Sequence, residues 1–129
     1  MKYITQSIAL LVTALFLPLA VSAAAPQGHQ VTSTGDLIEL CSVSTDDPLY
    51  DAAMGFCLGY IDAALDYHAE LTAGPKYDAL TCPGNSITRE EVVTVVVEWS
   101  RRNAQYQNTE TPVTGVMRAV TEKWPCSGQ

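Results

Sequence analysis

The stretch ITREEVVTVVVEWSRRN, residues 87–103, decides the fold class. The side chains at 92–97, five valines and one threonine, are of the kind that strands prefer. Two observations favour a helix instead. Thr88 and Glu91 form the capping-box signature of a helix start, and apolar residues then continue at helical spacing, at Val92, Val96 and Trp99. We therefore predict a helix over about residues 89–104, with a strand over 92–97 as the alternative.

A long helix is predicted before this one, over about residues 48–71, and a proline at its start suits a first helical turn. Gly55 and Gly59 lie four residues apart within it. Because a glycine costs a helix about 1 kcal/mol, we expect another backbone to pack close to this pair. Apolar residues that step by three or four predict the buried face: Leu49, Ala53, Phe56, Tyr60, Ala64, Tyr67 and Leu71.

Two shorter helices complete the set. One starts with Ser33 or Thr34 as its N-cap and ends near Cys41. The other starts with Thr111 as its cap and Pro112 in its first turn, and it ends before the proline of the WPC sequence. Their apolar sides are formed by Leu37, Ile38 and Leu40 and by Val113, Val116, Met117, Val120 and Trp124.

The N-terminal residues 1–23 have the features of a secretory signal peptide. A basic residue precedes an apolar run over about 8–21, and small residues follow, with cleavage expected after Ala23. A membrane anchor is the alternative, but the run is short for a spanning helix. Residues 24–32 form the expected flexible leader. We expect residues 33–129 to form an all-α, compact four-helix domain that is soluble outside the cytoplasm.

The chain has four cysteines, all of them after the expected cleavage site: Cys41, Cys57, Cys82 and Cys126. An even number in an exported chain predicts two disulfides. Metal binding is the competing use, but no Cys-x-x-Cys or His-x-x-x-His spacing is present, and the only histidines are His29 and His68. We predict no metal site, and His68 as a surface or packed residue.

Helix order narrows the pairing of the cysteines. Cys82 lies just before the third helix and Cys126 just after the fourth, so an antiparallel pair of helices would bring them together. Cys41 ends the first helix, and a short loop lets that helix fold back beside Cys57 in the second. We therefore favour Cys41–Cys57 and Cys82–Cys126 over the two other connectivities, with stabilisation of about 3 and 4 kcal/mol in the loop-entropy model.

The formal net charge of −7 excludes some classes of partner. An acidic protein repels phosphate backbones and anionic lipids, so we expect neither nucleic acid nor a membrane surface as a partner. A basic protein partner, or solubility alone, is compatible with the charge.

The motifs of common enzyme classes are absent. The sequence has no His-Glu-x-x-His, no Gly-x-Ser-x-Gly, no phosphate-binding loop and no cysteine left over as a nucleophile. We therefore predict a protein that is not an enzyme, with no catalytic residues and no cofactor. A hydrolase that uses a pair of carboxylates is the alternative.

Four segments in order resemble the Rap/Tai immunity-protein family of type VI secretion systems: LIELC, CLGYIDAALD, TCPGNSIT and VMRAVTEKWPC. The matching residues are Cys41, Cys57, Gly59, Tyr60, Asp66, Cys82, Pro83, Trp124, Pro125 and Cys126. The resemblance spans about residues 34–126. Two features depart from the family pattern, namely Ala63 in place of a second glycine and the missing proline around 103–107.

The resemblance implies a periplasmic, helical protein that is often a homodimer. Its members bind peptidoglycan amidase effectors that neighbouring cells deliver, and they block the cleft of the effector without catalysis. The alternative function is a small periplasmic acid-response chaperone, or another periplasmic scaffold with no toxin partner. A chaperone of that kind is expected to unfold or dissociate in acid and expose apolar surface.

Two groups of residues are candidates for the partner contact. The loop before the last helix offers Tyr106, Gln107, Asn108 and Glu110, which could enter a cleft or form an ordinary connection. The stripe of Asp62, Asp66 and Glu70 could meet a basic patch, or it could be the solvated face of a helix.

Overall fold

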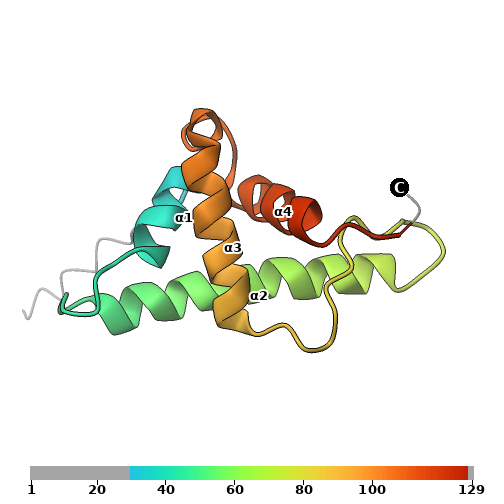
Figure 1. The fold of residues 1–129 in the computed structure, drawn as a ribbon, viewed down its shortest axis with the longest axis horizontal. Helices are drawn as coiled ribbons and strands as arrows, with labels where there is room; N and C mark the ends of the chain where they lie inside the picture. The colour runs from blue at the N-terminus through green and yellow to red at the C-terminus, as the bar shows by residue number, and fades with distance from the viewer. Residues whose placement is uncertain (1–29, 128–129) are drawn as a thin grey trace, which may run out of the picture.

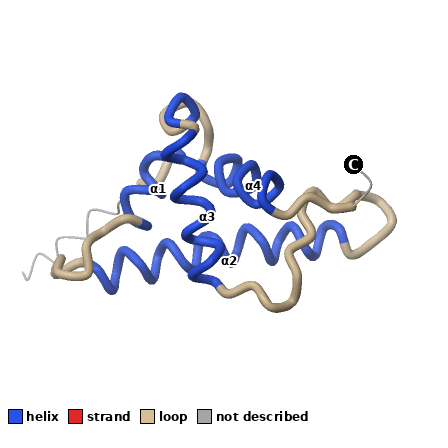
Figure 2. The backbone as a smooth tube through the Cα atoms, viewed as in Figure 1, coloured by secondary structure: helices blue, strands red, loops and turns tan. Residues whose placement is uncertain are grey.

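The computed structural model describes residues 30–127, which form four α-helices and one short 3-10 helix (Figures 1 and 2). Their bounds are α1 Thr34–Cys41, α2 Tyr50–Thr72, α3 Arg89–Arg102, η1 Ala104–Tyr106 and α4 Pro112–Lys123. The only β feature in this range is an isolated bridge between Thr81 and Pro125. The all-α prediction is confirmed, and the strand alternative for 92–97 is wrong. The expected signal peptide and residues 24–29 of the leader lie outside the described residues.

The starts of α1 and α3 follow from their capping boxes. At α3, the Thr88 hydroxyl accepts from the Glu91 backbone N–H, and the Glu91 carboxylate accepts from the Thr88 N–H. At α1, Ser33 is the N-cap and Asp36 completes the box. These reciprocal bonds satisfy N–H groups that a helix start leaves unpaired. Thr34, the other N-cap candidate, is thereby free for the tertiary contact described below.

The arrangement has α2 as its longest element, with α3 crossing it and α1 and α4 on either side of α3 (Figure 1). The axis of α4 turns away from that of α3 in this view, so these helices cross and do not form the antiparallel pair on which the Cys82–Cys126 pairing was argued. All four helices contribute to one core: Leu37, Ile38, Cys41, Cys57, Ile61, Val92, Val93, Val96, Val97, Trp99, Val116, Ala119 and Val120. The valine run therefore lies in a helix, and most of its valines pack into the core.

The predicted buried face of α2 is correct only in part. Ala53 is buried, and Tyr60 and Ala64 are partly buried against the core, but the other predicted residues are exposed. The residues of α2 that are buried are Ala53, Cys57 and Ile61. Leu49 is 69% exposed, Phe56 45% and Tyr67 68%. Apolar side chains lie on several sides of this helix, so their period alone does not select a face. The disulfide from Cys57 to α1 selects it, because that bond turns the cysteine side of α2 towards the core.

The expectation for Gly55 and Gly59 is also wrong. A Cβ at either position would have open space around it, so neither glycine serves a close helix contact in the described chain. Gly115 in α4 does, because a Cβ there would lie 3.0 Å from the Cβ of Thr34 and closer still to its methyl group. In α4 the predicted core residue Val113 is 43% exposed, and Gly115 and Ala119 are buried instead.

Both predicted disulfides are confirmed. Cys41 and Cys57 join α1 to α2 with their Cα atoms 5.2 Å apart. Cys82, within the α2–α3 loop, is joined to Cys126 in the chain after α4, with a Cα separation of 4.9 Å. Backbone and side-chain bonds support the second bridge. The Cys82 N–H donates to the Trp124 carbonyl, and the buried Thr81 hydroxyl lies within hydrogen-bonding distance of the last carbonyls of α4.

Candidate functional site

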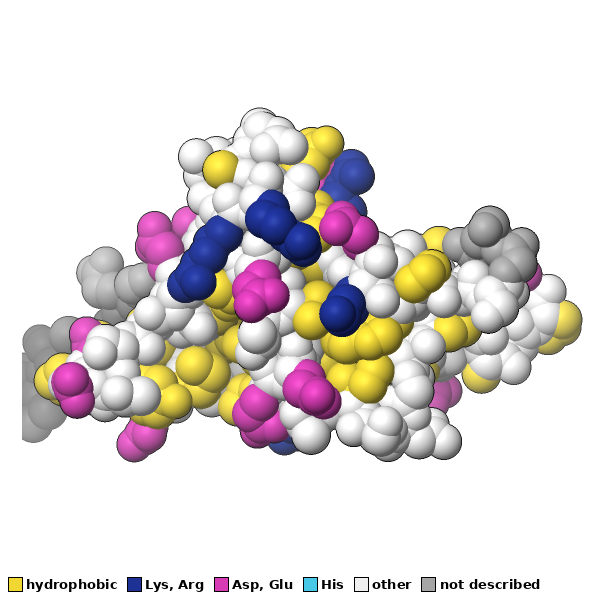
Figure 3. Space-filling view, in the orientation of Figure 1, with side chains coloured by type: hydrophobic (Ala, Val, Ile, Leu, Met, Phe, Trp, Pro, Cys, Tyr) yellow, Lys and Arg dark blue, Asp and Glu magenta, His cyan; other side chains and the backbone are white. Residues whose placement is uncertain are grey.

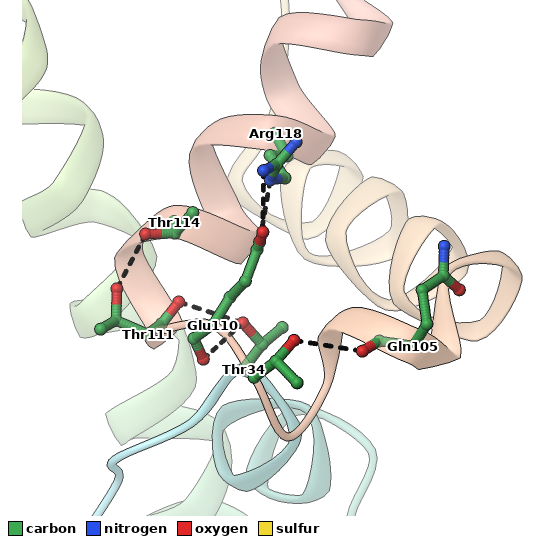
Figure 4. A network of polar contacts seen from close by, with 7 residues as sticks. Thr34, Gln105, Glu110, Thr111, Thr114 and Arg118 are labelled. Atoms are coloured by element: carbon green, nitrogen blue, oxygen red, sulfur yellow. Dashed lines mark hydrogen bonds and ion pairs between the residues drawn. The ribbon is translucent and has the colours of Figure 1, made fainter.

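The segment 103–111 connects α3 to α4, and it is fixed to the start of α1 (Figure 4). The Thr34 N–H donates to the Glu110 carbonyl at 2.9 Å, and the Gly35 N–H donates to the Gln107 carbonyl at 2.8 Å. The Thr34 hydroxyl donates to the Thr111 carbonyl at 3.0 Å. The first N–H groups of a helix have no partner within the helix, so α1 uses them to hold this loop in one place.

An ion pair braces the same loop from the other side. The guanidinium of Arg118 in α4 meets the Glu110 carboxylate twice, Nε to Oε2 and Nη2 to Oε1, each at 2.8 Å. Glu110 is only 14% exposed in its side chain. Arg118 also lies over the Tyr106 ring, 4.9 Å from its centroid. Two-point pairing of this kind fixes geometry as well as charge, so the carboxylate of Glu110 is already occupied.

Gln107 ties the loop to α3. Its side-chain amide donates to the backbone carbonyl and the hydroxyl of Ser100, at 3.1 and 3.0 Å. Ser100 is fully buried. Of the four loop residues proposed from the sequence, Tyr106, Gln107 and Glu110 therefore build the loop. Asn108 is the exposed one, and exposed Gln105 and Thr109 flank it.

A groove of about 690 Å³ lies beside this loop, between α3, η1 and α4. Its wall contains stacked rings of Trp99 and Tyr106, whose centroids are 5.9 Å apart, and the Trp99 indole N–H donates to Glu122 at 2.8 Å. The lining is mainly apolar: Leu80, Trp99, Asn103, Tyr106, Val113, Thr114, Met117, Arg118, Thr121 and Glu122. An exposed polar loop beside an apolar groove is a surface suited to a protein partner.

The acidic stripe does not belong to this surface. Asp62 forms an ion pair with Arg89 at the start of α3, whereas the loop follows the end of α3. A helix of this length spans about 20 Å, and Figure 1 shows the loop at the end of α3 away from α2. Asp66 and Glu70 are exposed, and neither forms an ion pair within residues 30–127.

Other chemistry-bearing groups have structural partners. The His68 Nε2 accepts from the Leu80 N–H at 3.0 Å, which ties the loop after α2 back to that helix. The part of the chain that the structure describes holds no cluster able to bind a metal and no free cysteine. No helix in it is long and apolar enough to cross a membrane.

Backbone hydrogen bonds from the N–H groups of Thr32 and Ser33 lower the pKa of the Asp36 carboxyl group to about 2.

Sequence reasoning missed the residues that fix the loop from outside it, namely Thr34, Gly115 and Arg118. A threonine after an N-cap, a glycine within a helix and an arginine on its surface carry no local signal. Only the contact between α1 and α4 gives them a role, and that contact joins residues about eighty positions apart in the chain.

The comparison with protein families identifies a family for this chain. The family model of Rap1a immunity proteins matches residues 33–126, which covers α1 to the last cysteine and so includes both disulfides, the braced loop and the groove. No curated protein and no solved structure matches the chain. The match covers most of the sequence, and the chain therefore belongs to the Rap1a immunity protein family.

Proposed function

We propose that this protein is a periplasmic immunity protein that binds and blocks a peptidoglycan amidase effector of a type VI secretion system. The observation that carries the proposal is the loop 103–111, which α1, α3 and α4 hold in one conformation while its tip stays exposed. A pre-ordered loop loses little conformational entropy on binding, and this favours tight association. Family membership supports an immunity role against a secreted effector.

The proposed mechanism is occlusion without catalysis. Asn108 enters the effector's cleft with Gln105 and Thr109 beside it, and the apolar groove below receives side chains from the rim of that cleft. Water and the peptide substrate are then excluded from the effector's catalytic groups. Tyr106, Gln107 and Glu110 act as positioning residues, since their side chains are already engaged within the protein.

We also propose that the protein forms a homodimer through the far end of α2. Tyr67 and Leu71 are exposed there on one side of the helix, and Tyr77 is exposed in the segment that follows. Exposed apolar side chains that gather in this way mark protein interfaces. Light scattering of the mature chain is expected to give twice the monomer mass, and Tyr67→Lys is expected to restore the monomer. A monomeric wild-type chain would contradict the dimer.

Competition between sibling cells tests the immunity proposal. A strain that lacks this gene is expected to die beside its parent only when the parent's secretion system is active, and an exported copy is expected to rescue it. A copy without residues 1–23 is expected to fail. Equal survival while the system fires would contradict self-immunity.

Two matched variants locate the contact surface. Asn108→Arg places a long cation at the loop tip and is expected to abolish rescue and to stop inhibition of the effector on purified cell-wall sacculi. Glu70→Lys changes an exposed residue of α2 and is expected to keep both. Circular dichroism of the purified variants shows whether each one is folded. Loss of rescue by folded Glu70→Lys but not by Asn108→Arg would place the contact on α2 instead.

A further inference from the structure

The net charge of the protein lies in one half of the fold. Residues 30–75 contain no lysine or arginine. The charged residues in this range are all acidic: Asp36, Glu39, Asp46, Asp47, Asp51, Asp62, Asp66 and Glu70. In residues 76–127, lysines and arginines equal the acidic residues in number. The half that contains α1 and α2 therefore presents a negative field, while the half with α3, α4 and the loop 103–111 is neutral in sum.

A second groove lies in this acidic half, about 410 Å³ in volume, between the end of α1, the following turn and the start of α2. We call it the α1–α2 groove, and its lining residues are Glu39, Leu40, Val43, Asp47, Leu49, Ala52, Ala53 and Phe56. Figure 3 shows hydrophobic side chains with acidic ones around them at the end of the molecule where α1 and α2 meet. The groove is separate from the loop 103–111 and from the groove beside it.

The floor of the α1–α2 groove is apolar and its charged rim is only acidic. Leu49 and Phe56 leave much of their apolar surface in water, and burial of that surface against a partner would be favourable. The rim carboxylates of Glu39 and Asp47 form no ion pair with any residue in the range 30–127. The Asp47 carboxylate accepts a hydrogen bond from the Leu49 N–H. Within the described residues, the rim therefore offers negative charge that no ion pair neutralises.

The apolar floor and the acidic rim together favour one class of binding partner. A second copy of the chain would bring an identical acidic rim to the same place, because a two-fold interface pairs each surface with itself, and like charges would repel. A segment with an apolar side chain and neighbouring lysines or arginines satisfies both the floor and the rim. We propose that the α1–α2 groove binds a cationic amphipathic segment of a partner protein, at a site independent of the loop that we assign to the effector's cleft.

A pair of model peptides tests this. The probe is a synthetic amphipathic helix of leucine and lysine, and its counterpart has glutamate at every lysine position. With the mature chain, the lysine peptide is expected to bind, to shift the amide resonances of Leu40, Val43 and Phe56 in NMR spectra, and to dissociate as salt is raised. The glutamate peptide is expected not to bind. Equal binding of the two, or shifts confined to other surfaces, would overturn the proposal.

Charge-matched variants separate the groove from the general field. Glu39→Gln with Asp47→Asn is expected to weaken binding of the lysine peptide about fivefold, and the asparagine can still accept from the Leu49 N–H. Asp66→Asn with Glu70→Gln removes the same charge from α2 outside the groove and is expected to have less than half of that effect on the free energy. Equal losses of affinity in the two double variants would show that the peptide responds to the overall negative charge and not to the α1–α2 groove. If the chain self-associates without peptide, and the amide resonance of Phe56 shifts when it does so, then the groove binds a second copy of the chain. Either result would overturn the proposal without bearing on the immunity test.

Discussion

The side chain of Thr34 fills the space that a side chain at Gly115 would need. A Cβ at Gly115 would lie 3.0 Å from the Thr34 Cβ, and the Thr34 methyl and hydroxyl groups are nearer still. The absence of that Cβ lets the start of α1 approach α4 closely enough for the Thr34 hydroxyl to reach the Thr111 carbonyl. This contact between two helices thus helps to position the candidate contact loop, together with the Arg118–Glu110 ion pair and the bonds from Gln107 to Ser100.

Gly115→Ala is expected to destabilise the protein by about 1–2 kcal/mol. The new methyl group forces α1 and α4 apart, an overpacking cost that exceeds the gain of about 1 kcal/mol from helix propensity. Urea unfolding followed by circular dichroism measures the change. Gly59→Ala is the matched control, since it adds the same methyl group to α2 in open space, and it is expected to stabilise by up to about 1 kcal/mol. Stabilisation by both would show that α1 and α4 accommodate the methyl group freely.

Arg118→Met is expected to cost about 1–2 kcal/mol and to loosen the loop. It leaves the mostly buried Glu110 carboxylate without its two charge-assisted bonds. Amide hydrogen exchange is expected to rise in residues 103–111 and at the start of α1. Arg102→Met provides the control, because its contact with Glu122 is 3.8 Å long and both side chains are well exposed. A loss below about 0.5 kcal/mol is expected there. Unchanged exchange in Arg118→Met would show that the loop does not need the ion pair.

The stability of α1 is expected to fall in acid because of Asp36. Its folded-state pKa is about 2, below the usual value of 3.8, since the carboxylate accepts backbone bonds from Thr32 and Ser33. The contribution is therefore complete above about pH 4 and is lost as the pH falls through 2. Asp36→Asn is expected to lower stability at neutral pH and to flatten the pH dependence between 4 and 2. A parallel loss of stability in both proteins over that range would contradict this assignment.

The two disulfides are expected to contribute unequally. The Cys82–Cys126 bridge closes 44 positions and the Cys41–Cys57 bridge closes 16. Replacing both members of a bridge by serine is expected to cost about 4 kcal/mol for the longer loop and about 3 kcal/mol for the shorter one in the loop-entropy model. Thermal unfolding of the two double variants shows which disulfide contributes more to stability. A larger loss from the shorter loop would show that contacts in the folded state outweigh chain entropy.

Much of the fold could be predicted because its signals are local. The capping box of Thr88 and Glu91 resolved the valine run in favour of a helix, and the same bonds are present in the structure. The favoured cysteine pairing was also correct, although α3 and α4 cross and do not form the antiparallel pair assumed for Cys82–Cys126. The family was also recognisable, because the cysteine, glycine and proline segments that carry the resemblance occur in order along the chain.

The contact loop shows where local signals end. Its polar residues were predictable as a candidate surface, but the sequence did not separate Asn108, which is exposed, from Glu110, which Arg118 engages. That division depends on a partner from another helix. The buried face of α2 could not be predicted fully for a related reason. Apolar residues lie on several sides of this helix, so its hydrophobic pattern does not point to a single face.

The sequence by itself therefore determined where the helices begin, which cysteines pair, and the family of the chain. These depend on neighbours in the chain or on the order of elements. Tertiary structure alone decided which face of α2 is buried, which glycine permits a close contact, and which loop residues face a partner. Each of those is a contact between residues distant in the chain, and such contacts form only after the entropy of closing the loops between them has been overcome.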